Sequence, residues 1–130
     1  MIVVDASAIV ELVLRTKKGE RVAARLADDG GPFLAPHLVD PEVMQALREL
    51  VRLRQVDVAH AQAALTAFAE FPLQRIPHDV LWARMWALRE NLTAYDATYV
   101  VVAELSGAAL VTCDGPLSRS PGHRAKIELF

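Results

Sequence analysis

The stretch Ile2-Val3-Val4-Asp5-Ala6-Ser7 opens the chain and gives the clearest indication of its fold. Three β-branched residues followed at once by an aspartate predict a short buried strand with a carboxylate at its carboxyl end. The same pattern returns late in the chain, in Ala109-Leu110-Val111-Thr112-Cys113-Asp114. Open parallel α/β sheets place their ligand sites at the carboxyl ends of their strands. The two stretches therefore predict that Asp5 and Asp114 face one crevice.

Between these two strands, short apolar segments alternate with segments of helical periodicity. The expected strands are 2–4, 33–35, 73–76, 109–112 and 127–129. The expected helices are 7–14 with Ser7 as N-cap, 19–27, one with Pro41 in its first turn and Val43, Met44, Leu47, Leu50 and Val51 on its apolar face, 59–71 started by Asp57, 79–92 capped by Asp79, and 96–105 ended by Gly107. This alternation predicts an α/β fold with a central, mostly parallel sheet of about five short strands flanked by helices.

Length and composition limit the classes of protein that fit. A chain of 130 residues with 53% hydrophobic and 23% charged residues fits one domain, 1–130, with a substantial core. A net charge of -2 argues against non-specific coating of nucleic acid, so a polyanionic substrate needs a local basic patch or a metal ion. Cys113 is the single cysteine, and no signal peptide or apolar stretch of the ~20 residues needed to span a bilayer is visible. We therefore expect a cytoplasmic protein without a membrane partner.

Four acidic residues carry the candidate chemistry: Asp5, Glu42, Asp96 and Asp114. Two are expected at strand ends, and the other two lie near helix N-termini, where the helix dipole favours a carboxylate by roughly 0.3 to 1 kcal/mol. The chain has 16 acidic residues, and most of them are expected to be helix caps or solvated surface groups. For Glu42 an ordinary first-turn acid stays an open alternative. Asp40, two residues earlier, competes for the same position in the site.

Clustered carboxylates need a cation. Like charges ~4 Å apart repel by about 4 kcal/mol at an effective dielectric constant near 20, so four of them do not all stay ionised without one. Ligation by oxygen alone selects Mg2+ or Mn2+ rather than zinc. The four histidines are scattered at 37, 60, 78 and 123, as is typical of surface or turn residues, and no Gly-rich phosphate loop or nucleophile elbow is present.

Four motifs together carry a family resemblance. They are Val-Val-Asp-Ala-Ser-Ala at 3–8, Pro-Glu-Val at 41–43 leading into Ala46-Leu47, Thr-Ala-Tyr-Asp-Ala at 93–97, and Leu-Val-Thr-Cys-Asp at 110–114. Over essentially its whole length the chain resembles PIN-domain ribonucleases of the VapC type, the toxins of bacterial or archaeal toxin–antitoxin pairs. The family pattern differs at Gly115-Pro116, where members often carry larger or basic residues.

The resemblance implies a metal-dependent endoribonuclease that hydrolyses RNA phosphodiesters. It implies that Asp5, Glu42, Asp96 and Asp114 are the catalytic, metal-binding acids for Mg2+ or Mn2+, with Ser7 and Thr112 as polar supports. It further implies a homodimer and a VapB-type antitoxin that blocks the acidic pocket. Two alternatives stay open: a PIN-domain nuclease of RNA processing or DNA metabolism, and a non-catalytic PIN binding module.

Basic and aromatic residues suggest further contacts. The densest basic stretch includes Arg15, Lys17 and Lys18, our candidates for RNA binding, followed by Arg21 and Arg25; a second comprises Arg48, Arg52 and Arg54. Solvated helix faces would give the same patterns. Trp82 and Trp86 lie one helical turn apart, with Arg89 three residues later. Such a stripe usually packs into a core, but it would also serve a dimer or antitoxin interface.

Overall fold

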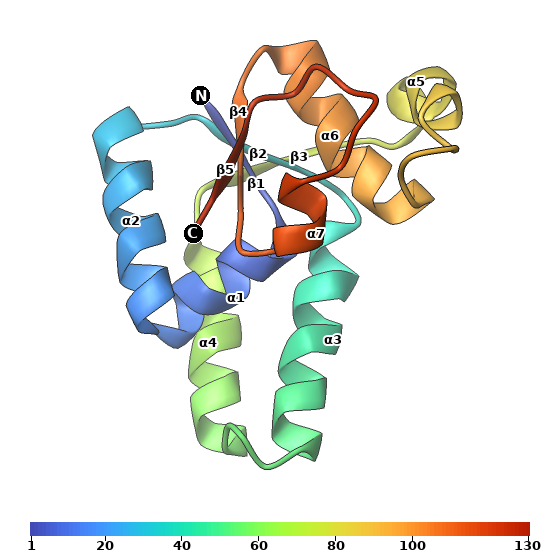
Figure 1. Cartoon of the computed structure of the whole chain (residues 1–130). Coiled ribbons are helices and arrows are strands. Elements are labelled where there is room, and N and C mark those ends of the chain that lie inside the picture. The colour runs from blue at the N-terminus through green and yellow to red at the C-terminus, as the bar shows by residue number, and fades with distance from the viewer.

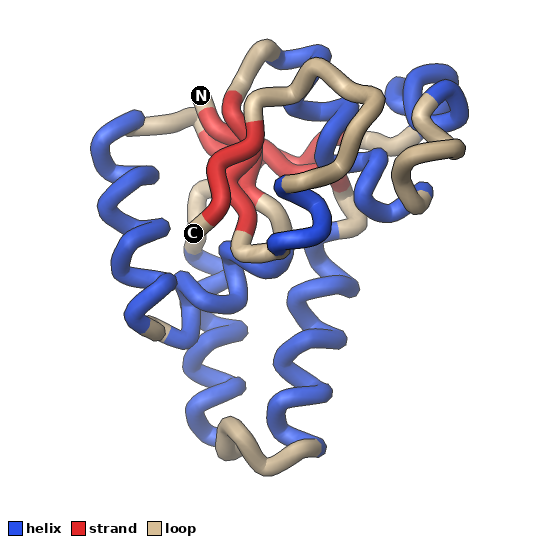
Figure 2. Tube along the Cα trace, viewed as in Figure 1, coloured by secondary structure: helices blue, strands red, loops and turns tan.

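A computed structural model describes residues 1–130 and contains one five-stranded sheet flanked by helices (Figures 1 and 2). The strands are β1 (Ile2–Val4), β2 (Phe33–Pro36), β3 (Leu73–Ile76), β4 (Ala109–Thr112) and β5 (Ile127–Leu129). The helices are α1 (Ala6–Leu14), α2 (Lys17–Asp29), α3 (Val39–Arg52), α4 (Val58–Glu70), the 3-10 turn η1 (Asp79–Leu81), α5 (Trp82–Ala87), α6 (Ala94–Ser106) and α7 (Gly115–Ser118). The expected α/β class is therefore confirmed.

The sheet has the strand order β3-β2-β1-β4-β5, and every neighbouring pair is parallel. The chain winds outward from β1 to β2 and β3, and then crosses back to β4 on the other side of β1. This reversal makes the boundary between β1 and β4 a topological switch point. Val4 pairs with Val111, and the Asp5 N–H donates to the Val111 carbonyl at 3.2 Å. The carboxyl ends of β1 and β4 therefore lie side by side.

The core encloses the central strand. Every residue of β1 is buried, which explains its uninterrupted apolar sequence. Helix α6, whose residues 97–103 are all buried, contacts β1, β2 and β4. Helix α1 contacts α2, α3 and α4 (Figure 1). None of these helices combines the length and the apolar character that a membrane crossing requires.

Most element boundaries agree with the expectations from sequence. Four strands match to the residue, and β2 is one residue longer. Asp57 caps α4 by accepting from the His60 N–H, and Gly107 ends α6 in a left-handed conformation with φ 67°. The N-cap expected at Ser7 is wrong. Asp5 itself caps α1, because its carboxylate accepts from the Ala8 N–H at 2.9 Å.

The largest difference concerns the helix expected over 79–92. The chain forms the 3-10 turn η1 and then the six-residue α5, and Asp79 does not cap a helix. No residue of α5 is buried, so of the two interpretations of Trp82 and Trp86 core packing is wrong, and the interface interpretation stays untested. An ion pair ties α5 to α6: the Arg84 guanidinium donates to Glu104 at 2.7 and 2.9 Å. This pairing holds the pKa of Glu104 down at about 2.

Candidate active site

Asp5 is the most enclosed acid of the site. It follows β1 directly, and only 5% of its surface is exposed. Its Oδ1 accepts from the Ala8 N–H and from the Ser7 hydroxyl at 2.7 Å, and its Oδ2 accepts from the Thr112 hydroxyl. Burial raises the pKa of Asp5 even though these three hydrogen bonds favour the charged form. The carboxylate is thus held in one orientation at a cost in solvation.

Ser7 and Thr112 connect Asp5 to the loop after β4. The Ser7 hydroxyl accepts from the Cys113 N–H at 2.9 Å while donating to Asp5. Thr112, which is fully buried, accepts from the Asp114 N–H at 2.9 Å while donating to Asp5. Both hydroxyls therefore use donor and acceptor capacity at once. The geometry gives them the supporting contacts that the family resemblance implies.

Asp114 and Asp96 each sit at the start of a helix. Asp114 caps the short helix α7 by accepting from the Leu117 N–H at 3.2 Å. Asp96 lies in the first turn of α6, and its N–H donates to the Thr93 hydroxyl at 3.1 Å. Burial and the charge of Asp114 raise the pKa of Asp96. The two acids are therefore close enough to repel each other.

Glu42 lies in the first turn of α3 and faces the same acids. Burial, followed by the charges of Asp5 and Asp96, raises its pKa to about 7, although a neighbouring Tyr99 hydroxyl opposes the shift. Glu42 Oε1 is buried, and neither it nor the Tyr99 hydroxyl has a hydrogen-bond partner of acceptable geometry. An unpartnered buried carboxylate oxygen is costly unless another group binds it.

The four acids therefore form one electrostatically connected cluster. The charge of Asp114 raises the pKa of Asp5 and that of Asp96. The charges of Asp5 and Asp96 in turn raise the pKa of Glu42. We call these four residues the acid cluster. No three His, Cys, Asp or Glu side chains in the chain stand close enough together to hold a metal ion. The donor chemistry and the orphaned Glu42 oxygen still fit a hard divalent cation, provided that the side chains close around it.

Asp40, the competitor for the position of Glu42, is engaged elsewhere. Its carboxylate accepts three hydrogen bonds of 2.7 to 2.9 Å from the Arg75 guanidinium of β3. This pairing leaves Glu42 as the acid that α3 contributes to the cluster.

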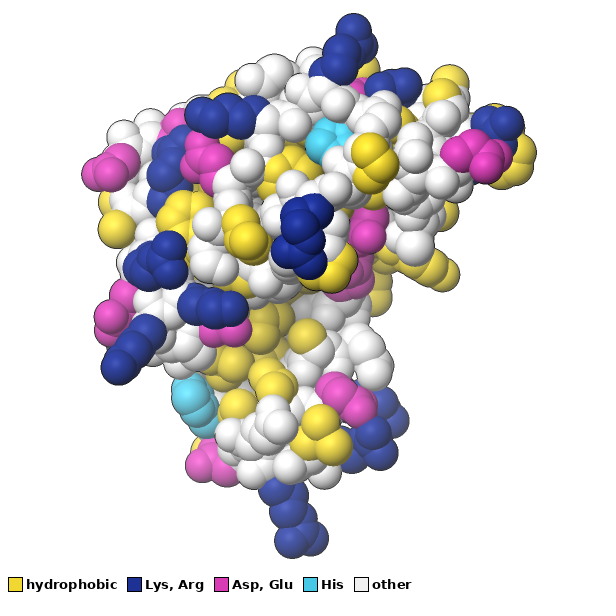
Figure 3. Space-filling model, in the orientation of Figure 1, with side chains coloured by type: hydrophobic (Ala, Val, Ile, Leu, Met, Phe, Trp, Pro, Cys, Tyr) yellow, Lys and Arg dark blue, Asp and Glu magenta, His cyan; other side chains and the backbone are white.

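The basic candidates divide by position. Arg15 and Lys17 lie beyond the far end of α1, about 13 Å of helix away from Asp5. Lys18 and Arg21 lie nearer to the loop after β4. Their charges act on Cys113 in that loop, because they oppose the rise in its pKa that burial causes. Of the other candidates, Arg25, Arg48 and Arg52 make ion pairs with carboxylates of the chain. On the face drawn in Figure 3, basic side chains gather at several places without forming one continuous surface.

Sequence reasoning missed three features of this site. Tyr99 follows Asp96 by three residues, a spacing that places both on one helix face and could have been noticed. Helix α7 was missed because four residues are too short for periodicity, although Pro116 just after Asp114 is a helix-start signal. Arg119 was also missed. It is exposed, and its guanidinium folds back over Gly115, with Nη1 3.0 Å from where a Cβ of that residue would be, so its charge lies next to the loop that carries Asp114.

Comparison with known proteins identifies relatives over the whole chain. The PIN domain family model matches residues 2–122. A ribonuclease of Mycobacterium tuberculosis, VapC12, is 41% identical over 129 residues, which cover 99% of this chain and 98% of the relative.

Solved structures agree with the fold. A crystal structure of PAE2754 from Pyrobaculum aerophilum has a TM-score of 0.69 at 28% identity and covers 97% of this chain and 81% of that one. VapBC2 from Rickettsia felis, solved bound to a DNA fragment from its promoter, has a TM-score of 0.68 at 15% identity and covers 100% and 99%. That second likeness supports the fold alone.

Proposed function

Because the chain belongs to the PIN domain family, we propose that it is a VapC-type endoribonuclease, the toxin of a toxin–antitoxin pair, which hydrolyses RNA phosphodiesters. The observation that carries this proposal is the acid cluster at the switch point of the sheet, where four carboxylates repel one another and Glu42 has a pKa of about 7. VapC12, which is named a ribonuclease and aligns with this chain over nearly its whole length, supports the reaction.

The acid cluster would hold Mg2+ or Mn2+ through Asp5, Glu42, Asp96 and Asp114. A divalent cation at such a site lowers the pKa of water and neutralises charge that develops on the phosphate and on the leaving 3' oxygen. The remaining roles belong to the chain's own groups. Ser7 and Thr112 fix the Asp5 carboxylate by donating to both of its oxygens, so little side-chain freedom is left to be lost on binding.

Substrate binding needs cations beside this acidic site, since RNA is a polyanion. Lys18 and Arg119 are the candidates that lie near the loop carrying Asp114. Arg15 and Lys17, at the far end of α1, would reach only more distant phosphates. We propose that basic groups contact the RNA backbone and set its register while the acid cluster acts on one phosphate.

The partners follow from the same family assignment. We propose a VapB-type antitoxin that covers the acid cluster, and a homodimer of this chain. The resemblance to VapC-type toxins, which pair with such antitoxins, supports the first of these. A single cysteine, Cys113, fits a reducing compartment, and we propose that the protein works in the cytoplasm.

Mapping the cleavage products tests this function. Metal-free ribonucleases use the 2'-hydroxyl of the substrate as the nucleophile and leave a cyclic phosphate. A metal-activated water does not need that hydroxyl. We expect 5'-phosphate and 3'-hydroxyl ends, loss of cleavage in EDTA, and residual cleavage when a 2'-deoxy nucleotide occupies the scissile position. A 2',3'-cyclic phosphate formed in EDTA would overturn the metal assignment. Absence of cleavage, with RNA binding retained, would favour the non-catalytic binding module.

A further inference from the structure

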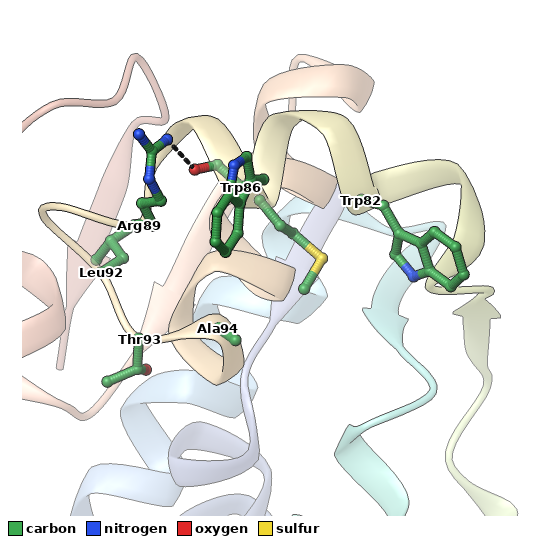
Figure 4. A pocket seen from close by; sticks show the side chains of 7 residues that line it. Trp82, Trp86, Arg89, Leu92, Thr93 and Ala94 are labelled. Atoms are coloured by element: carbon green, nitrogen blue, oxygen red, sulfur yellow. Dashed lines mark hydrogen bonds between the residues drawn. The ribbon is translucent and has the colours of Figure 1, made fainter.

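A cavity of about 520 Å³ lies between α5 and the start of α6 (Figure 4). Its walls come from Met85 and Trp86 of α5, Arg89 and Leu92 of the following turn, and Thr93 and Ala94 at the start of α6, with Trp82 at its rim. This volume is within the range of sites that bind small organic groups. The fold does not need the aromatic residues here, because α5 buries none of its own side chains.

Trp86 is the main aromatic surface of this cavity. It is 71% exposed, so most of its indole is in contact with solvent and contributes little to folding. Figure 4 shows its ring above Thr93 and Ala94, whereas Trp82 lies one helical turn earlier in α5, at the other end of the cavity. Trp82 is similarly exposed, at 67%, so the two indoles differ mainly in how near they lie to Thr93 and Ala94.

A cation is held beside the indole. The Arg89 guanidinium carbon lies 4.9 Å from the centre of the Trp86 ring, and Nη1 donates to the Trp86 carbonyl at 3.0 Å. Its carboxylate neighbour, Glu90, lies 3.6 Å away and is itself highly exposed, so the charge of Arg89 is only weakly compensated. A flat aromatic face next to a guanidinium suits one nucleotide, because the base stacks and the phosphate pairs with the cation.

The cavity adjoins the turn of α6 that carries one acid of the cluster. Thr93 lines the cavity, and its hydroxyl also accepts from the Asp96 N–H at 3.1 Å. Ala94 and Asp96 lie in the same first turn of α6. A nucleotide in the cavity is therefore about one helical turn, roughly 5 Å along the axis, from an acid of the cluster.

We propose that this cavity binds one unpaired nucleobase of the RNA substrate, stacked on Trp86, with Arg89 at an adjacent phosphate. The inference rests on the proposed ribonuclease function and adds a subsite beside the cleaved bond. A base that must stack here has to be unpaired, so the subsite selects single-stranded RNA.

Intrinsic fluorescence tests the stacking directly, since Trp82 and Trp86 are the chain's two tryptophans. In a cleavage-deficient Asp5→Asn background, single-stranded oligoadenylate should quench the emission of Trp82→Phe, which retains Trp86. It should quench the emission of Trp86→Phe, which retains only Trp82 at the other end of the cavity, markedly less. The same RNA in a duplex should quench neither variant. Equal quenching of both variants by the single strand, or none, would overturn the subsite.

Kinetics with the wild-type acid cluster provide the second measurement. We expect Trp86→Leu to raise KM about tenfold with little change in kcat, whereas Trp86→Phe, which keeps an aromatic ring, should stay within about threefold of wild type. Leu105→Ala, at an exposed position at the opposite end of α6, is the control and should leave KM unchanged. Arg89→Gln should reduce the slope of log affinity against log salt by about 0.7, the value for one phosphate contact on a single strand.

Three further outcomes distinguish this inference from the alternatives. If Trp86→Leu converts a dimer to a monomer in sedimentation without RNA, the cavity belongs to an interface between copies of the chain and the subsite is wrong. If the wild type cleaves no RNA, the proposed function fails, while the quenching experiment still shows whether a base enters the cavity. A wild-type KM for Trp86→Leu, with cleavage intact, overturns the subsite alone.

Discussion

At the scale of single residues, Asp5 combines the roles of helix cap and acid. Its Oδ1 starts α1, and its Oδ2 is bound by Thr112, so the same carboxylate joins local structure to the site. Sequence alone predicted a carboxylate at this strand end, because the apolar run stops there. It assigned the cap to Ser7 instead, since serine and aspartate are equally good N-caps and only the backbone geometry distinguishes the two positions.

Asp5→Asn tests the assignment of the acid cluster. We expect RNA cleavage to fall by more than the roughly 10- to 100-fold typical of outer-shell partners, because a ligand charge is lost. Stability without metal should stay the same or rise by up to about 1 kcal/mol, since a buried carboxylate with a raised pKa is removed. Asp40→Asn is the matched control: it should keep activity and lose about 0.5 to 1 kcal/mol through its pairing with Arg75. Wild-type cleavage by Asp5→Asn would exclude a ligand role.

Glu42 makes stability depend on pH in a defined direction. The unfolded carboxyl titrates near 4.5 and the folded one near 7, so the folded state binds the proton more tightly. Stability without metal should therefore fall as pH rises from about 4.5 to about 7. Glu42→Gln removes this loss and should exceed the wild type by on the order of 1 to 2 kcal/mol at about pH 8, with no such gain near pH 4. Urea unfolding in EDTA measures both, and a pH-independent difference would contradict the raised pKa.

At the scale of elements, periodicity identifies an apolar face but not what lies behind it. Trp82 and Trp86 share a face, as their spacing indicates, yet α5 projects from the sheet beside α6 and leaves both exposed (Figure 1). The central strands were easier to predict, because β1 is buried and apolar throughout and residues 110–112 of β4 are buried as well. A short apolar run therefore predicts a strand well, whereas the periodicity of an exposed helix such as α5 does not show what it packs against.

The crossing of α1 and α2 depends on Gly19. A Cβ on this residue would lie 2.0 Å from the Glu11 carbonyl oxygen, a backbone atom that cannot rotate away. Gly19→Ala should therefore destabilise the protein by about 2 kcal/mol, although alanine favours a helix by about 1 kcal/mol. Ala24→Gly, on an exposed position of the same helix, calibrates the propensity and should lose about 1 kcal/mol. A gain in melting temperature for Gly19→Ala would show that the helices separate at little cost.

At the scale of the whole molecule, the topology brings together acids that are far apart in sequence. Asp5 and Asp114 converge because β1 and β4 are neighbours, and Asp96 joins them because α6 leads into β4. Sequence predicted convergence at the carboxyl edge of a parallel sheet. The pairing of Asp40 with Arg75 of β3 was not visible, because it depends on the position of β3 beside β2.

Metal binding should stabilise the whole fold, since a ligand that binds only the folded state favours it by mass action. At a free concentration of 100 times its Kd, Mg2+ or Mn2+ should add about 2.7 kcal/mol, which corresponds to a rise of several degrees in the melting temperature. Asp5→Asn and Asp96→Asn should lose most of this rise, whereas Asp40→Asn should keep it. Because the carboxylates must first close around the ion, part of the intrinsic affinity is used in that rearrangement, and millimolar concentrations are the range to scan. A melting temperature that stays constant across millimolar Mg2+ and Mn2+ would contradict a metal site in the acid cluster.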